Sequence, residues 1–417
     1  MTKQTVHIIG AGISGLRCAE ILCENDIDVH LIEQTDSIGG RMKTTEKSGF
    51  LLDHGFHVMQ TGYRYSRNAI DFDSLGSRSF SPGATIVTSV NGIVKFTTLS
   101  DPLRKPLASL SALKSQKWSD LAKIAKLQFS LKYLPTEKLL SGGDNTTEYF
   151  LDRIGFSESF KNEFIRPLFS GIFLESGLQT SERMFKFVFA SMARGKMVLP
   201  REGIQAYPNL LANKIGRQRI TLSTTAEAIN SKTVKIDDSL MSTDQVVVAH
   251  APKEEMKTMR KVWTVYYCAP RSPIKGNYLI VNGDYEIGKN VVAHLAVPSD
   301  VQPSYSPPDQ ALVAVTVVGD AADALGLKSK ESVKEQVGKE VKNWFPESRK
   351  WDVLDVIETR YALPARGERS GISNMPKIKE NTIISCGDHM THGSMEGAIM
   401  SADHAASEVM RRLTLDK

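Results

Sequence analysis

The stretch VHIIGAGISG, residues 6–15, decides the fold of this chain. Its first four residues are typical of a short buried strand, and three glycines with the spacing G-x-G-x-x-G follow directly. From Ile13 the apolar positions recur with the period of a helix. A second strand, residues 29–32, then ends at Glu33. This order of strand, glycine turn, helix and strand with a terminal acid predicts a unit that binds a dinucleotide.

Each glycine of the turn has its own mechanical role. Gly10 permits the tight turn, Gly12 lets the backbone approach a pyrophosphate, and Gly15 lets helix and strand pack closely. The helix that begins with Ile13 and Ser14 offers unpaired N–H groups and a partial positive charge. We therefore expect all five residues to contribute to a phosphate site.

A second glycine loop follows the second strand. It consists of Gly39, Gly40, Arg41 and Met42. Such a loop suits a segment that folds back over the same dinucleotide, and Arg41 adds charge for the pyrophosphate or closes the adenine side. Glu33 is expected to accept hydrogen bonds from the adenosine ribose. An ordinary Gly-Gly turn with a surface arginine is the alternative; the first interpretation favours FAD over NAD.

With these two loops and several later segments, the sequence resembles the flavoprotein group that contains amine oxidases, protoporphyrinogen oxidases and phytoene desaturases. The resemblance spans nearly the whole chain and is thin between Tyr63 and Met197. The later segments that carry it are DHGFH at 53–57, LPREGI at 199–204, ITL at 220–222, IISCGD at 383–388 and SMEGAI at 394–399. It implies an α/β fold: a Rossmann-type FAD-binding domain with an inserted α+β substrate domain.

The resemblance also implies roles for individual residues in the middle of the chain. Gly55, Phe56 and His57 correspond to the segment that runs beneath the isoalloxazine ring. His57 is the candidate catalytic residue, with a purely structural hydrogen-bonding role as the alternative. Ala226 corresponds to the strand that returns to the adenine side.

The C-terminal segment provides the second half of the implied FAD site. By resemblance, Gly387 and Asp388 lie at the ribityl chain, which Asp388 binds. Met395, Gly397 and Ala398 approach the pyrimidine end of the flavin and the phosphates. An apolar strand that ends in Gly-Asp also places a carboxylate at the carboxyl edge of a sheet, where ligands bind in open α/β folds. A plain terminal strand and helix is the alternative.

The sequence also departs from the group in places. A flavin-linking cysteine is expected shortly before the terminal strand, yet none occurs from Tyr361 to Ile384, so we expect noncovalent FAD. Ser394 occupies one of the two places where monoamine oxidases frame the substrate with tyrosines, which disfavours amine oxidation. His389 and His392 are further candidates for the edge of the ring, and Tyr361 for the pocket.

The remaining segments predict the second lobe. Residues 101–194 favour helices, with Asp144 and either Thr180 or Ser181 as caps, and residues 262–318 favour an antiparallel sheet. Phenylalanines between 150 and 173 form a core stripe or line a tunnel for an apolar substrate. We expect the FAD-binding domain to comprise residues 1–66, 198–260 and 378–417, and the substrate domain residues 67–197 and 261–377.

Charge and cysteine content limit the partners. The net charge of +5 is too small to predict nucleic-acid binding. Residues 101–140 hold eight Lys/Arg and three Asp/Glu, which indicates either a solvated helical face or peripheral contact with an anionic bilayer. The four cysteines form no C-x-x-C pair, so no metal site is predicted. Without a leader or an apolar span, we expect a cytoplasmic protein.

These observations predict an FAD-dependent oxidoreductase that removes hydride from a hydrophobic or amine-bearing small molecule. A flavin-dependent isomerase or mutase without net oxidation is the alternative, and a flavin-stabilised binding protein is a third. No second glycine fingerprint for a nicotinamide follows. We therefore expect oxygen, a quinone or a partner protein as the electron acceptor.

Overall fold

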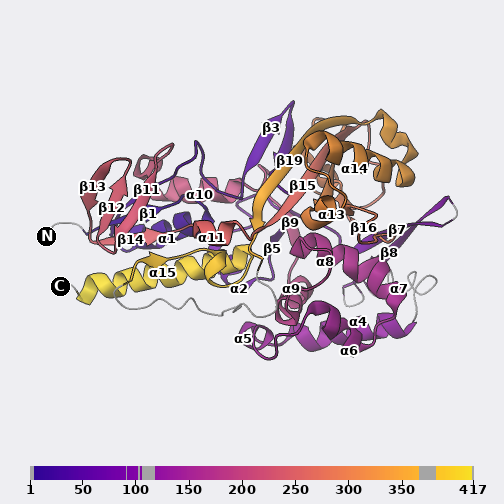
Figure 1. Cartoon of the computed structure of the whole chain (residues 1–417), viewed down its shortest axis with the longest axis horizontal. Helices are drawn as coiled ribbons and strands as arrows, with labels where there is room; N and C mark the ends of the chain where they lie inside the picture. Colours follow the sequence, from indigo (N-terminus) through magenta and orange to yellow (C-terminus); the bar gives the residue numbers. More distant parts are fainter. Residues whose placement is uncertain (1–3, 91, 102–103, 106–117, 366–381, 416–417) are drawn as a thin grey trace.

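A computed structural model describes residues 4–90, 92–101, 104–105, 118–365 and 382–415. Two units lie side by side along the long axis (Figure 1). A parallel sheet lies in the unit that holds both ends of the chain, and a larger mixed sheet with a group of helices forms the other. The predicted α/β class with a mixed α+β unit is confirmed.

The first unit is built on a five-stranded parallel sheet. Its order is β10 (Ile220–Thr221), β2 (Asp28–Ile32), β1 (Thr5–Ile9), β14 (Gln245–Val248) and β20 (Ile384–Ser385). Apolar residues on both faces of β1 and β14 are buried, as expected of a covered parallel sheet. The strands come from three separate stretches of sequence, so the sheet forms only when distant parts of the chain meet.

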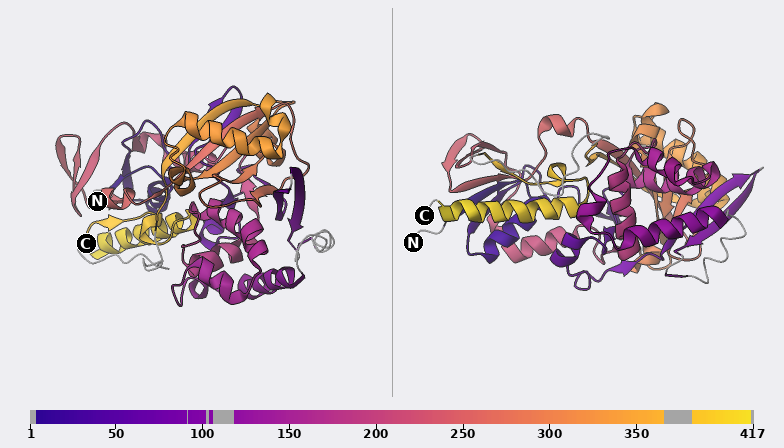
Figure 2. Two further views of the ribbon diagram at one scale, coloured as in Figure 1. Left: turned by 45° about the vertical axis from the view of Figure 1, so that its right-hand side comes forward. Right: turned by 90° about the horizontal axis from the view of Figure 1, so that it is seen from below.

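Helices cover one face of this sheet and a small sheet covers the other. Helix α1 (Ile13–Glu24) packs against both α10 (Ala206–Ile215) and α15 (Met395–Leu415). On the opposite face, Val234 packs with Ile9 and Val246. Val234 belongs to the antiparallel sheet of β11 (Ala226–Asn230), β12 (Thr233–Ile236) and β13 (Ser239–Ser242). Figure 2 shows α15 extending along the first unit.

The second unit contains a seven-stranded sheet. Its order is β19 (Asp352–Leu363), β15 (Arg260–Ala269), β18 (Ala311–Val318), β17 (Val292–Ala296), β16 (Leu279–Asn282), β7 (Gly83–Val90) and β8 (Ile93–Ser100). The expected antiparallel pairing holds from β15 to β16, but β16 and β7 pair in parallel. The sheet is therefore mixed, because β7 joins it from a distant part of the chain.

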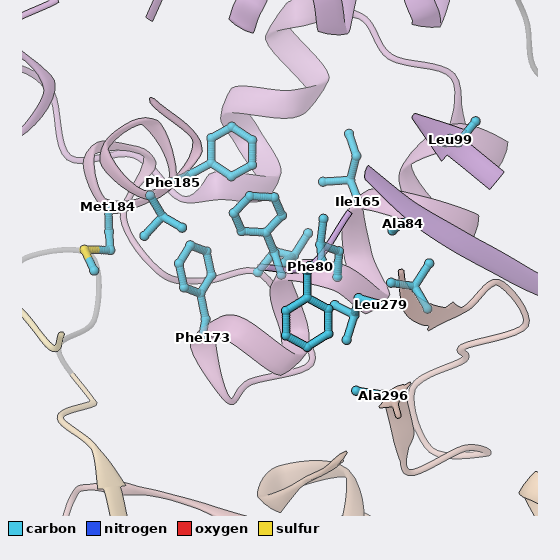
Figure 3. Packing of buried hydrophobic residues seen from close by; sticks show 14 of the residues in the cluster. Phe80, Ala84, Leu99, Ile165, Phe173, Met184, Phe185, Leu279 and Ala296 are labelled. Carbon is cyan, nitrogen blue, oxygen red and sulfur yellow. The ribbon is translucent and has the colours of Figure 1, made fainter. Parts of the chain in front are cut away.

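Helices enclose both faces of the mixed sheet. Helix α14 (Lys330–Trp344) covers one face, through Val333, Val337 and Val341. The helices toward the other face are α4 (Trp118–Lys132), α5 (Thr136–Leu139), α6 (Thr147–Ile154), α7 (Glu158–Phe160), the π-helix η2 (Lys161–Ile165), α8 (Arg166–Phe173) and α9 (Glu182–Arg194). In Figure 3, Phe80, Phe173 and Phe185 from this side gather in one cluster.

Most of the phenylalanine stripe belongs to the core. Phe150, Phe156, Phe160, Phe169 and Phe173 are all buried. Aromatic packing of this kind needs no ligand, but Phe160 and Phe173 also line the cavities described below, so core packing and lining occur together.

The helix caps were predicted only in part. Ser181 caps α9 by accepting a hydrogen bond from the backbone N–H of Arg183, as expected. The expected cap Asp144 is wrong: Thr146 caps α6, because it has extended backbone directly before the first helical residue. The Asp144 carboxylate instead pairs with the guanidinium of Arg183 at 2.8 Å.

Short elements complete the chain. They are β3 (Thr44–Lys47), β4 (Phe50–Asp53), β5 (Met59–Gln60), α2 (Arg64–Ala69), β6 (Arg78–Ser79), β9 (Met197–Leu199), α11 (Lys253–Met256), α12 (Pro298–Val301), α13 (Gly319–Ala324) and the 3₁₀ helix η6 (Asp388–Met390). In the described part of the chain, no helix has both the length and the apolar character needed to span a membrane.

The buried carboxylate of Asp53 forms hydrogen bonds with segments from different parts of the chain. The Asp53 carboxylate accepts hydrogen bonds from Thr44 Oγ1 at 2.6 Å, the Ile204 N–H at 3.0 Å and the Tyr305 hydroxyl at 2.9 Å. Burial raises the pKa of Asp53 to about 6. The site described next lies against the segment that follows this residue.

Candidate active site

A groove opens at the carboxyl ends of the parallel strands, with a cavity volume of about 470 Å³. The glycine turn, the second glycine loop and the C-terminal segment all line it. The predicted residues that line it are Gly10, Gly12, Ile13, Ser14, Glu33, Gly39, Gly40, Arg41, Met42, His57, Gly387, Asp388, Met395 and Ala398. The topology thus brings both ends of the sequence to one edge of one sheet.

The glycine turn has open space where a pyrophosphate needs it. A side chain at Gly12 would meet no heavy atom within 4 Å of its Cβ, although Gly12 lines the groove. At Gly15, by contrast, a Cβ would lie 2.0 Å from the Gly10 carbonyl oxygen, so this glycine serves helix packing. Gly10 has a φ of +106°, a conformation that favours glycine. This open cradle at the start of α1 fits a dinucleotide phosphate.

Glu33 is held rigidly by the surrounding backbone. Its carboxylate accepts hydrogen bonds from the Ala11 N–H at 2.8 Å, the Thr35 N–H at 3.0 Å and Thr35 Oγ1 at 2.8 Å. A carboxylate has about four acceptor positions, so one remains for a ribose hydroxyl. The geometry is compatible with the role expected of Glu33.

Arg41 and Asp388 form an ion pair across the groove. The guanidinium donates to the two carboxylate oxygens at 2.8 and 2.6 Å, and also to the Ala362 carbonyl at 3.1 Å. Burial alone would lower the pKa of Arg41, but Asp388 raises it above its ordinary value. The two residues expected to bind different parts of the dinucleotide therefore also bind each other.

Four other predicted residues lie outside the groove lining. Gly397 packs at the start of α15, where a Cβ would lie 2.2 Å from the His392 carbonyl oxygen. Gly55 and Phe56 line a second cavity. Ala226 begins β11, in the sheet that covers the other face, because the chain leaves the parallel sheet after β10.

The second cavity has a volume of about 280 Å³ and adjoins the groove. The residues that line both are His57, Val58, Ala362, Leu363, Ser394 and Met395. His57 Nε2 donates to the His54 carbonyl oxygen at 2.8 Å, and burial lowers the pKa of His57. A carbonyl oxygen only accepts, so the neutral ring carries its lone pair on Nδ1.

A third cavity, of about 410 Å³, continues from the second. The residues that line both are Phe80, Leu168, Met192, Met197 and Leu279, all apolar. Trp118 and Leu121 of α4 line its far side. The three cavities form a series from the groove, through the second cavity, to helix α4.

Sequence reasoning missed several residues of the groove. Ala249, His250 and Ala251 line it directly after β14. The same rule that identified Asp388 applies to them, because they follow a buried strand at the carboxyl edge of the sheet. Two further methionines of the lining, Met256 and Met259, carry no such signal. Of the further candidates, Tyr361 and His389 line the groove and His392 lines the second cavity.

Known proteins resemble this chain over most of its length. The family described as "Flavin containing amine oxidoreductase" matches residues 13–259 and 286–410. Polyamine oxidase 7 of Oryza sativa subsp. japonica is 26% identical over 268 residues, which cover 59% of this chain and 55% of that protein. Hydroxysqualene dehydroxylase of Sinorhizobium fredii is 40% identical over 67 residues, 16% of each chain. The chain thus matches about half the length of the first relative and less of the second.

A solved structure shows the same fold. An oxidoreductase from Methanosarcina mazei superposes with a TM-score of 0.74 at 16% identity, covering 98% of this chain and 100% of that one. The family match covers well over half of the sequence and includes most of the residues that line the groove. The chain therefore belongs to the flavin containing amine oxidoreductase family and is an FAD-dependent oxidoreductase of the amine oxidase and desaturase type.

Proposed function

We propose that this chain removes hydride from an uncharged, largely apolar small molecule. The observation that carries the proposal is the lining of the second cavity. Among the described residues, no Asp or Glu lines it, and its permanent charge is Arg260. A cationic amine would find no carboxylate there, and an unpaired charge is costly to bury. Of the two relatives above, the one named for hydroxysqualene supports this class of substrate better than the one named for polyamines.

The roles of the chain's residues follow from their positions. FAD, when bound, supplies the hydride acceptor. We propose that the groove residues identified from the sequence hold it noncovalently, with Gly12 at the pyrophosphate. His57, which lines both cavities, orients the substrate or accepts a proton at Nδ1. The apolar walls exclude water from the reacting groups. We propose an FAD-binding domain of residues 1–66, 198–260 and 378–417 around the groove and a substrate domain of residues 67–197 and 261–377, with the second cavity between them.

Anaerobic bleaching of the bound flavin tests the proposal. We expect long-chain alcohols, alkenes or isoprenoids to abolish the visible flavin absorbance, with a product more oxidised by two electrons. Matched alkyl amines are expected to reduce it much more slowly. Isomerised product at constant oxidation state would select the isomerase or mutase instead. Rapid reduction by amines alone would contradict the proposed substrate class.

The rate at which different acceptors reoxidise the reduced enzyme tests the identity of the electron acceptor. We propose oxygen, a quinone or a partner protein, in keeping with the single glycine fingerprint at residues 10–15. The reduced enzyme is mixed with oxygen or with a soluble quinone. Rapid reoxidation by one of them identifies that acceptor, and slow reoxidation by both favours a partner protein.

We further propose that α4 and its flanks touch an anionic membrane surface. Trp118, Phe129 and Tyr133 are 68, 62 and 70% exposed, which is unusual for large rings, and Lys126 and Lys132 lie among them. Aromatic rings beside lysines are typical of interfacial helices. The remainder of the basic segment, residues 102–103 and 106–117, lies outside the described residues.

Sedimentation with vesicles tests this contact. We expect binding to phosphatidylserine vesicles that weakens with salt and falls about tenfold in the variant Trp118→Ser/Phe129→Ser. Ile93→Ser, at an exposed apolar residue of β8, is the control that should bind as before. Equal binding by all three proteins would contradict the contact.

A further inference from the structure

One face of the mixed sheet carries a row of three polar side chains that form no hydrogen bond with the described residues. Thr264 of β15, Thr316 of β18 and His294 of β17 are partners in register across three neighbouring strands. Directly paired residues point to the same face of a sheet. We call these three residues the polar row. Around them, the same face carries apolar residues such as Ala296 and Ala314 (Figure 3 labels Ala296).

The polar row is buried but unsatisfied. Thr264, Thr316 and His294 are 0, 2 and 5% exposed. Among the described residues, none forms a hydrogen bond with either threonine hydroxyl or with either ring nitrogen of His294. Each buried polar group left unpaired costs about 1–3 kcal/mol, so a cluster of three calls for an external partner.

Two of the three residues of the row line a cavity, whereas Thr264 does not line it. His294 and Thr316 line the second cavity, which His57 and Met395 connect to the FAD groove. Space for the imidazole is provided by Gly171 of α8, where a Cβ would lie 1.7 Å from His294 Nε2. Because Gly171 has no side chain, the imidazole of His294 fits between α8 and the sheet.

We propose that the polar row binds one neutral hydroxyl or carbonyl group of the otherwise apolar substrate. A hydroxyl both donates and accepts, and the threonine hydroxyls and the imidazole offer both functions in return. Burial lowers the pKa of His294 to about 4, so its ring is neutral at pH 7 and does not attract an anion. An ammonium group gains no charge partner from these residues. This inference rests on the proposed apolar substrate and specifies its single polar group.

The role of the polar row in ligand recognition is tested by measuring ligand binding to the oxidised holoenzyme, so that no substrate needs to be turned over. The probes are 1-octanol, 1-fluorooctane and octylammonium, each titrated while the visible spectrum of the bound FAD is followed. Wild type is expected to bind octanol about tenfold more tightly than fluorooctane, since one neutral hydrogen bond is gained. Thr316→Val and His294→Leu are each expected to reduce that preference to less than threefold while leaving fluorooctane binding unchanged.

The controls separate recognition from folding. Thr316→Val is nearly isosteric and keeps the test valid even where His294→Leu folds poorly. Tyr267→Phe removes a hydroxyl that also has no hydrogen-bond partner in the described part of the chain but lies on the opposite face of the sheet, and it should leave the preference intact. A preference that survives both row variants, equal binding of both probes by wild type, or tightest binding of octylammonium would each overturn the inference. An enzyme that prefers octanol but is never reduced by any apolar substrate would contradict only the proposed function.

Discussion

Gly12→Val is expected to give a folded protein that purifies without FAD. The new Cβ meets no protein atom within 4 Å, so the apoprotein has room for it. The valine instead fills the part of the groove beside the start of α1, where a pyrophosphate would approach the backbone N–H groups. The flavin content of the purified protein, released with acid and measured by absorbance, should fall from about one per chain to nearly none.

Two other glycines make this result interpretable. Gly338→Val in α14 lies outside the groove and should stay fully yellow, because a Cβ there meets no atom of the described residues within 4 Å. Gly15→Ala would drive its Cβ to 2.0 Å from the Gly10 carbonyl oxygen and should lower the yield of folded protein itself. A Gly12→Val protein with full FAD content would show that the dinucleotide lies elsewhere. Acid that leaves the colour in the pellet would show a covalent link.

Asp388→Ala is expected to weaken FAD binding about a hundredfold. The substitution removes a buried carboxylate from the groove and leaves the Arg41 guanidinium without its ion-pair partner. Hydrogen bonds to charged groups contribute about 1.5–3 kcal/mol, and 2.7 kcal/mol corresponds to about a hundredfold. The dissociation constant is measured by titrating the deflavinated protein with FAD, and excess FAD should restore the colour.

A second ion pair in the same unit is the control for Asp388. Asp403 of α15 accepts a hydrogen bond from Arg17 of α1 at 2.9 Å, away from the groove lining. Asp403→Ala should lower the melting temperature of the apoprotein while leaving the FAD dissociation constant within about threefold of wild type. If both variants weaken FAD equally, Asp388 acts through the stability of α15 and not through the ligand.

Local rules in the sequence predicted the elements that form one wall of the groove. The turn at residues 10–15 needs only strand, glycine and helix signals within a short window, and the structure has each element where it was expected. Asp388 was predicted from the resemblance to the flavoprotein group, and the rule that a buried strand followed by Gly-Asp marks the carboxyl edge of a sheet agreed with it. Both rules depend on chain order alone.

What depends on register or on distant pairing could not be predicted. The parallel pairing of β16 with β7 joins residues 279–282 to residues 84–87. The polar row needs three strands to be aligned before Thr264, Thr316 and His294 become neighbours. The Arg41–Asp388 pair spans 347 positions. In each case the residues carry ordinary local signals, and only tertiary packing gives them a shared role.

The assembly of the groove from both ends of the sequence has a consequence for biosynthesis. Residues 10–42 are translated long before β20 and α15, which complete the groove. A nascent chain therefore exposes the cradle of Gly12 and the charge of Arg41 long before Asp388 exists. Cofactor capture must be a late event, and a message truncated before residue 388 should yield a colourless polypeptide however well its first strands fold.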